Sequence, residues 1–155
     1  MGFGALSVKG RALRYLAQRE HSRLELERKL ARHVQDTEAA TAQAQIAAAL
    51  DQLTAVGLLS EARAAEAVLL HQGRRFGTWR LKQVLQSKGL DPDLVATTLQ
   101  QARGTELQRA REVWSRRFGV APINAKQAIQ QMRFLAGRGF ETDVIRRVVH
   151  GREDD

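Results

Sequence analysis

The tetrapeptide Arg74-Arg75-Phe76-Gly77, RRFG, is repeated without change as Arg116-Arg117-Phe118-Gly119. Since the chain of 155 residues contains only five phenylalanines, two of them in one repeated tetrapeptide indicate a duplicated element. A second pair of segments supports the duplication, because residues 88–95 (KGLDPDLV) match residues 138–145 (RGFETDVI) in residue type at every position but one. The offset is 42 residues for the first pair and 50 for the second, so the later copy carries eight extra residues, which fit VAPINAKQ at residues 120–127.

The rest of the chain has the pattern of amphipathic helices, with apolar residues recurring three and four positions apart. No stretch alternates apolar and polar residues over a length that would predict a strand. Ser22 and Glu25 form a capping box, and Asp91 before Pro92 marks another helix start. We therefore expect an all-α fold with nine helices, near residues 8–18, 22–33, 39–56, 60–73, 78–88, 92–103, 105–118, 124–136 and 141–150.

Nine helices and the duplicated segments together predict three tandem three-helix repeats. A fainter first copy supports the third repeat, because Arg19-Glu20-His21-Ser22 aligns with residues 75–78 and also precedes a helix. The repeats are expected at residues 1–56, 57–103 and 104–151, followed by an acidic tail at residues 152–155. Units that contact mainly their neighbours form an elongated, curved stack, right- or left-handed.

The RRFG tetrapeptide is predicted to be the corner between the first and second helices of a repeat. Its glycine can adopt a left-handed conformation that ends the first helix, and its phenylalanine can pack back on that helix. These two roles leave the paired arginines unexplained, because any polar residue would serve at a corner.

The charge of the chain predicts an anionic partner. It carries 25 basic and 17 acidic residues, a net charge of +8, and 20 of the basic residues are arginines, which bind phosphates and carboxylates with two donors at once. Residues 74–88 contain five basic residues and no acid, and the acid-free segment 124–139 adds three more. The candidate partner-binding or nucleic-acid-binding residues are Arg74, Arg75, Trp79, Arg80, Lys82, Lys88, Arg116, Arg117, Arg133 and Arg138.

Each candidate also has a simpler interpretation. A single basic residue can belong to a solvated helix face, and Glu112 or Glu141 can pair with some of the later arginines. For Trp79 packing in the core is favoured, and the alternative is that it anchors a partner or stacks on a base. Trp114 falls on an apolar helix face, so we expect it in the core.

No catalytic or metal-binding motif is present. The chain has no cysteine, its four histidines lack ligand spacing, and neither a phosphate-binding glycine loop nor a Gly-x-Ser-x-Gly motif occurs. We therefore expect a protein without catalytic residues, metal or cofactor. The sequence also lacks a long apolar run and a signal peptide pattern, which predicts a cytoplasmic protein that does not insert in a membrane.

Three segments resemble the RecX regulatory proteins, which are modulators of the bacterial recombinase RecA. They are residues 9–30 (KGRALRYLAQREHSRLELERKL), residues 50–99 (LDQLTAVGLLSEARAAEAVLLHQGRRFGTWRLKQVLQSKGLDPDLVATTL) and residues 131–149 (QMRFLAGRGFETDVIRRVV). The resemblance covers nearly the whole chain and is one of repeated pattern, with no catalytic motif.

This resemblance implies three tandem three-helix repeats that bind the RecA filament on single-stranded DNA, lie in its groove and suppress its growth and activity. The expected protein is a monomer and a non-enzymatic regulator. The alternative is a module that binds DNA directly, because a basic helix of a three-helix unit can enter a major groove. Binding to a membrane surface is disfavoured, since no basic helix face lies opposite a broad apolar face.

Overall fold

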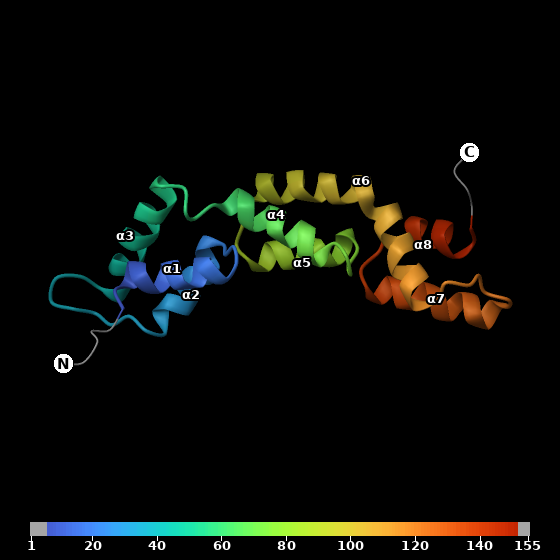
Figure 1. The fold of residues 1–155 in the computed structure, drawn as a ribbon, viewed down its shortest axis with the longest axis horizontal. Coiled ribbons are helices and arrows are strands. Elements are labelled where there is room, and N and C mark those ends of the chain that lie inside the picture. The colour runs from blue at the N-terminus through green and yellow to red at the C-terminus, as the bar shows by residue number, and fades with distance from the viewer. Residues whose placement is uncertain (1–5, 152–155) are drawn as a thin grey trace. The chain divides into compact units, whose positions relative to one another are not determined.

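The computed structural model describes residues 6–151, and this part of the chain contains helices and connecting turns but no strand (Figure 1). The eight helices are α1 (Val8–Gln18), α2 (Arg23–Ala31), α3 (Ala42–Ala55), α4 (Glu61–Gln72), α5 (Thr78–Ser87), α6 (Pro92–Arg117), α7 (Ala125–Gly137) and α8 (Thr142–Val149). The all-α prediction is confirmed. The predicted acidic tail, residues 152–155, lies outside the described residues.

Both predicted helix starts are present. The Ser22 hydroxyl accepts from the backbone N–H of Glu25 at 3.2 Å, and the Glu25 carboxylate accepts from the backbone N–H of Ser22 at 3.1 Å. Asp91 precedes Pro92 at the start of α6, and its carboxylate accepts from the backbone N–H of Asp93 at 2.8 Å. These side chains satisfy backbone donors that have no partner within a first helical turn.

The prediction of separate helices at 92–103 and 105–118 is wrong, because both belong to α6, which has 26 residues. Gly104 lies inside this helix with open space around its α-carbon, and an internal glycine costs about 1 kcal/mol relative to alanine without ending a helix. Figure 1 shows α6 bending near its middle. There the carbonyl oxygen of Ala102 accepts from the Arg109 side chain at 2.8 Å, a side-chain contact of the kind that bends helices.

The chain divides into two compact units. The first unit comprises residues 6–65 and the turn Lys88–Leu90, and the second comprises Glu66–Ser87 and residues 91–151. The core of the first unit is formed by Ala12, Leu26, Leu30, Ile46, Leu50, Leu53 and Leu59. The core of the second unit around α6, α7 and α8 is formed by Ala110, Val113, Leu135, Phe140, Ile145, Val148 and Val149. The assignment of the chain to three repeats remains a prediction.

The two RRFG glycines serve different purposes. Gly119 has a φ of +69°, so the prediction of a left-handed glycine at this corner is confirmed. Gly77 does not have a positive φ, and the same prediction is wrong there. A β-carbon at Gly77 would clash with backbone atoms of Gly139 and Phe140, so glycine is required by the close approach of two backbones.

Candidate partner-binding surface

The two RRFG corners come together in the second unit. The Arg116 side chain donates to the carbonyl oxygen of Arg74 at 2.7 Å, so one copy is hydrogen-bonded to the other. A concavity of about 290 Å³ lies at this junction. Its lining consists of Arg75, Val113, Arg116, Arg117, Phe134 and Arg138. Four of these six residues are arginines and none is acidic.

Arg109 and Glu106, which the sequence analysis did not single out, hold the RRFG corner at residues 74–77 in place. Arg109 donates to the carbonyl oxygens of Gly73 and Phe76, at 3.0 and 2.6 Å. Burial lowers the pKa of the Arg109 guanidinium, an effect that the nearby Glu106 charge opposes. The buried Glu106 carboxylate accepts from the first backbone N–H of α5, that of Thr78, at 3.1 Å. An arginine and a glutamate three residues apart on a helix are common, so only the tertiary structure distinguishes this pair.

Arginine side chains at the junction lie over phenylalanine rings. We call Arg75, Arg80, Arg117, Arg138 and the rings of Phe76, Phe118 and Phe134 the Arg–Phe cluster. The centroid of the Phe76 ring lies 5.2, 4.8 and 5.8 Å from the guanidinium carbons of Arg75, Arg80 and Arg138, respectively. The centroid of the Phe134 ring lies 5.4 Å from the guanidinium carbon of Arg117 and 5.1 Å from that of Arg138. The centroid of the Phe118 ring lies 5.9 Å from the guanidinium carbon of Arg117.

The cluster is continuous because some of its members have two partners. Arg138 lies over Phe76 and Phe134, and Arg117 lies over Phe134 and Phe118. The rings of Phe118 and Phe134 also meet edge to face, with centroids 5.4 Å apart. Each cation–ring contact at an exposed site contributes about 0.5–1 kcal/mol, so the rings restrict where the guanidinium groups lie.

None of the four arginine side chains of the cluster forms a hydrogen bond or an ion pair with residues 6–151. Nearby acids are engaged elsewhere: Glu112 accepts from Gln108 at 3.5 Å, and Glu141 lies 3.9 Å from Arg103. The expectation that these two glutamates pair with the later arginines is wrong. The N–H donors of the cluster are therefore available to an anionic ligand.

Trp79 is exposed to 60%, so the interpretation that it packs in the core is wrong. Leu81 and Leu85 define the buried face of α5, and Trp79 lies two residues before Leu81, on the opposite side of the helix. The Lys82 ammonium lies 5.8 Å from the Trp79 ring. Trp114, in contrast, is partly buried against the core, and its ring N–H donates to Gln131 at 2.8 Å.

Lys88 differs from the other candidates because it belongs to the first unit. Its ammonium lies 2.8 Å from the Glu25 carboxylate, and only 15% of its side chain is exposed. Burial of Glu25 opposes ionisation, but hydrogen bonds from Arg19, Lys88 and the Ser22 backbone outweigh it and lower the pKa of Glu25 to about 2. Lys88 is thus already paired in the free protein.

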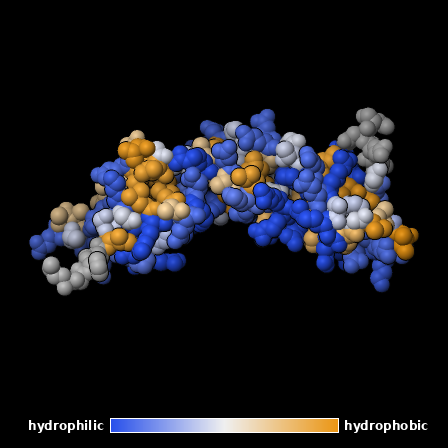
Figure 2. Space-filling model, in the orientation of Figure 1, coloured by the Kyte–Doolittle hydropathy of each residue, from blue (hydrophilic) through white to orange (hydrophobic). Residues whose placement is uncertain are grey.

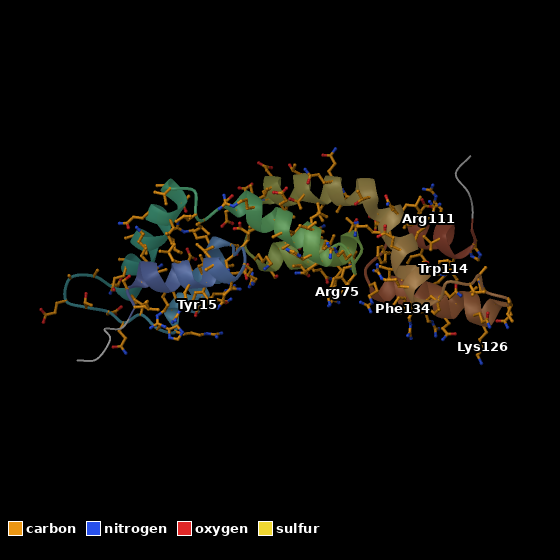
Figure 3. All side chains as sticks on the ribbon, in the orientation of Figure 1. Tyr15, Arg75, Arg111, Trp114, Lys126 and Phe134 are labelled. Carbon is orange, nitrogen blue, oxygen red and sulfur yellow. The ribbon has the colours of Figure 1, made fainter. Side chains whose placement is uncertain are left out.

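The remaining candidates, Arg74 and Arg133, are exposed in the second unit, and neither side chain has a partner among the described residues. Figure 3 shows Arg75, Phe134 and Lys126 on one side of this unit, at the lower edge of the view. Figure 2 shows that the visible face of the unit is mainly hydrophilic, with small separate hydrophobic patches. Val120 and Ile123, in the loop before α7, are exposed. The basic candidates of the second unit therefore lie on a largely polar surface.

Known proteins resemble this chain over nearly its full length. A regulatory protein RecX of Leptothrix cholodnii is 52% identical over 93% of this chain and 88% of the relative. The chain belongs to the RecX family. A regulatory protein RecX of Herminiimonas arsenicoxydans is 43% identical over 97% of this chain and 95% of the relative. The sequence model of the third three-helix domain of RecX matches residues 105–149.

A solved structure supports the fold independently of sequence. The crystal structure of RecX from Lactobacillus salivarius superposes with a TM-score of 0.71 and 18% identity, over 93% of each chain. The RecX relatives named above are regulatory proteins, and this chain shares their family and fold. No helix within residues 6–151 is long and apolar enough to cross a membrane, and no group of three metal-ligating side chains occurs in the same range.

Proposed function

We propose that this protein regulates RecA by binding the RecA filament on single-stranded DNA and lowering its recombinase and ATPase activity. Membership of the RecX family supports a regulatory role. The observation that carries the proposal is the Arg–Phe cluster, in which arginines line a concavity that has no acidic residue in its lining. Such a surface suits a partner rich in negative charge.

The proposed mechanism is binding at several points. Arg74 and Arg133 extend the positive charge beyond the Arg–Phe cluster, and both are exposed. A protein that contacts more than one filament component gains affinity, because each contact after the first is intramolecular. Binding that favours one arrangement of the RecA subunits then opposes the changes that filament growth and ATP hydrolysis require.

Charge reversal in the cluster tests this proposal. The variant Arg75→Glu/Arg138→Glu should raise the protein concentration needed for half-inhibition of RecA ATP hydrolysis by about tenfold or more, since bonds to charged groups contribute about 1.5–3 kcal/mol each. The matched control is Arg14→Glu/Arg28→Glu, which changes the charge equally at exposed positions of the first unit. Equal inhibition by the cluster variant and the parent protein would show that RecA is regulated through another surface.

The second candidate function, a module that binds DNA without RecA, is favoured by the unpaired guanidinium donors of the cluster. Its signature is tight binding to bare duplex that weakens steeply with salt, as counterions are released, and does not strengthen when RecA is added. Measuring the affinity for duplex DNA at several salt concentrations, with and without RecA, distinguishes the two functions.

A further inference from the structure

We infer that the Arg–Phe cluster binds the phosphodiester backbone of single-stranded nucleic acid, with Trp79 stacking on an adjacent base. The inference rests on the proposed function, because it assigns a ligand to the same surface. It excludes an acidic segment of a protein as the ligand of the cluster.

The first argument is the chemistry of the donors. All four cations of the cluster are arginines, and a guanidinium group presents planar pairs of N–H donors that match two phosphate oxygens. No described residue accepts from these donors. The rings of Phe76 and Phe134 restrict where the guanidinium groups lie, so less conformational entropy is lost when an oxyanion binds.

The second argument is the density of positive charge. Arg117 and Arg138 lie within 5.4 and 5.1 Å of the same ring centroid, that of Phe134, and line one small concavity with Arg75. A protein partner would have to bring several carboxylate side chains together here and would lose solvation and side-chain entropy for each. Phosphates of a nucleic-acid strand are already joined in sequence, so the strand supplies closely spaced negative charges without that cost.

The third argument separates single strands from duplexes. Each phenylalanine ring of the cluster already has a guanidinium carbon 4.8 to 5.9 Å from its centroid. The ring of Trp79 is largely exposed, and Trp79 is next to Arg80, a cluster member, in α5. Aromatic side chains stack on bases of single strands, whereas the bases of a duplex are stacked on each other. A phosphate site beside an open indole ring is typical of single-strand binding.

The main experiment measures the affinity for a fluorescein-labelled oligothymidylate by fluorescence anisotropy between about 50 and 200 mM salt. The variant Arg117→Gln/Arg138→Gln should bind about tenfold more weakly or worse, and the slope of log affinity against log salt should decrease by about 1.4, or about 0.7 for each phosphate that is no longer neutralised. The control Arg14→Gln/Arg28→Gln, in the first unit, should leave the slope nearly unchanged. Urea unfolding verifies that both variants are folded.

A second variant tests the stacking. Trp79→Ala should weaken binding to the oligothymidylate by about fivefold or more and leave binding to a duplex unchanged, since stacking on one base contributes about 1–3 kcal/mol. The side chain is exposed, so the substitution should not affect folding. Equal loss for single strand and duplex would contradict base stacking.

Inhibition of the RecA ATPase by the same variants separates this inference from the proposed function. If Arg117→Gln/Arg138→Gln binds the oligothymidylate as the parent does, the inference is overturned, and loss of RecA inhibition in that case identifies an acidic protein surface as the ligand. If oligothymidylate binding is lost while RecA inhibition persists, the inference holds and regulation of RecA through this surface fails.

Discussion

The corner at Arg19–Ser22 in the first unit and the corner at residues 75–78 in the second align in sequence, but their basic residues have different neighbours. In the first unit Arg19 and Lys88 share the carboxylate of Glu25, at 2.6 and 2.8 Å, and Arg63 pairs with Glu20 at 3.0 Å. In the second unit, the arginines of the corner lie over phenylalanine rings. Five of the six ion pairs within the described residues belong to the first unit.

The difference shows that the number of basic residues does not identify a binding surface. An acidic neighbour uses the donors of a cation, and a pair of this kind stabilises the folded chain. An aromatic neighbour also attracts the cation, but a ring has no carboxylate oxygen that accepts from the guanidinium N–H donors, and these can still bind an anionic ligand. The corner at Arg19–Ser22 is therefore suited to stability, and the corner at residues 75–78 is suited to binding.

The largest expected effect comes from adding a side chain at Gly77, which aligns with His21 of the first unit. Gly77→Ala should lower the free energy of unfolding by about 3 kcal/mol or more, because the new methyl group meets backbone atoms of Gly139 and Phe140 that cannot move independently. Urea unfolding measures the loss. Gly57→Ala is the control: its φ is +79° and no atom lies within 4 Å of an added β-carbon, so it adds the left-handed strain alone and should cost about 1–2 kcal/mol.

The second prediction removes Glu25, the acid that pairs with both Arg19 and Lys88 at the corner of the first unit. Glu25→Gln should lower the free energy of unfolding at pH 7 by about 3 kcal/mol, since a pKa of about 2 against an ordinary 4.5 corresponds to about 1.36 kcal/mol per unit. Because the folded pKa is the lower one, this stabilisation is complete above pH 4.5 and is lost as the pH falls through about 2. Chemical unfolding at several pH values should therefore show a decline below pH 4.5 in the parent that is weaker in the variant. An equal decline in both proteins would assign the pH dependence to other carboxyls.

Much of the fold was predictable, because helix periodicity, capping and the repeated segments are local features of the sequence. The neighbours of the basic residues were not. Lys88 and Arg75 lie in the same acid-free segment, yet Lys88 pairs with Glu25, which is 63 residues away in the chain. Phe134 joins the cluster from α7, and no pattern in the sequence connects it to Phe76. The exposure of Trp79 was also missed, because its residue type favoured core packing, whereas Leu81 and Leu85 define the buried face of α5 and Trp79 lies opposite to it.

The third prediction gives the Arg–Phe cluster an acidic residue, which none of its members is. Phe134→Glu places a carboxylate between Arg117 and Arg138, where it should accept from both and reduce affinity for the RecA filament by about thirtyfold or more, since losing even one charged contact costs about 1.5–3 kcal/mol. Phe134→Leu is the matched control, which removes the ring without adding a charge and should weaken binding only severalfold. If the two variants bind equally, the ring itself determines affinity, and an acidic neighbour does not occupy the arginine donors.

The smallest expected effect is that of pH near neutrality, and it separates the two units again. Burial, together with the charges of Arg19 and Lys29, lowers the pKa of His21, whose ring lies 2.8 Å from the Lys29 ammonium and also faces Glu25 and Tyr15. Its pKa is then lower in the folded than in the unfolded chain, so stability should decline as the pH falls below about 6.5 and the unfolded chain takes up the proton.

The Arg–Phe cluster contains no group that titrates between about pH 5.5 and 8, so the affinity for oligothymidylate should change by less than about twofold over that range. A change of about tenfold would mean that a histidine or a carboxyl, and not arginine alone, contacts the ligand.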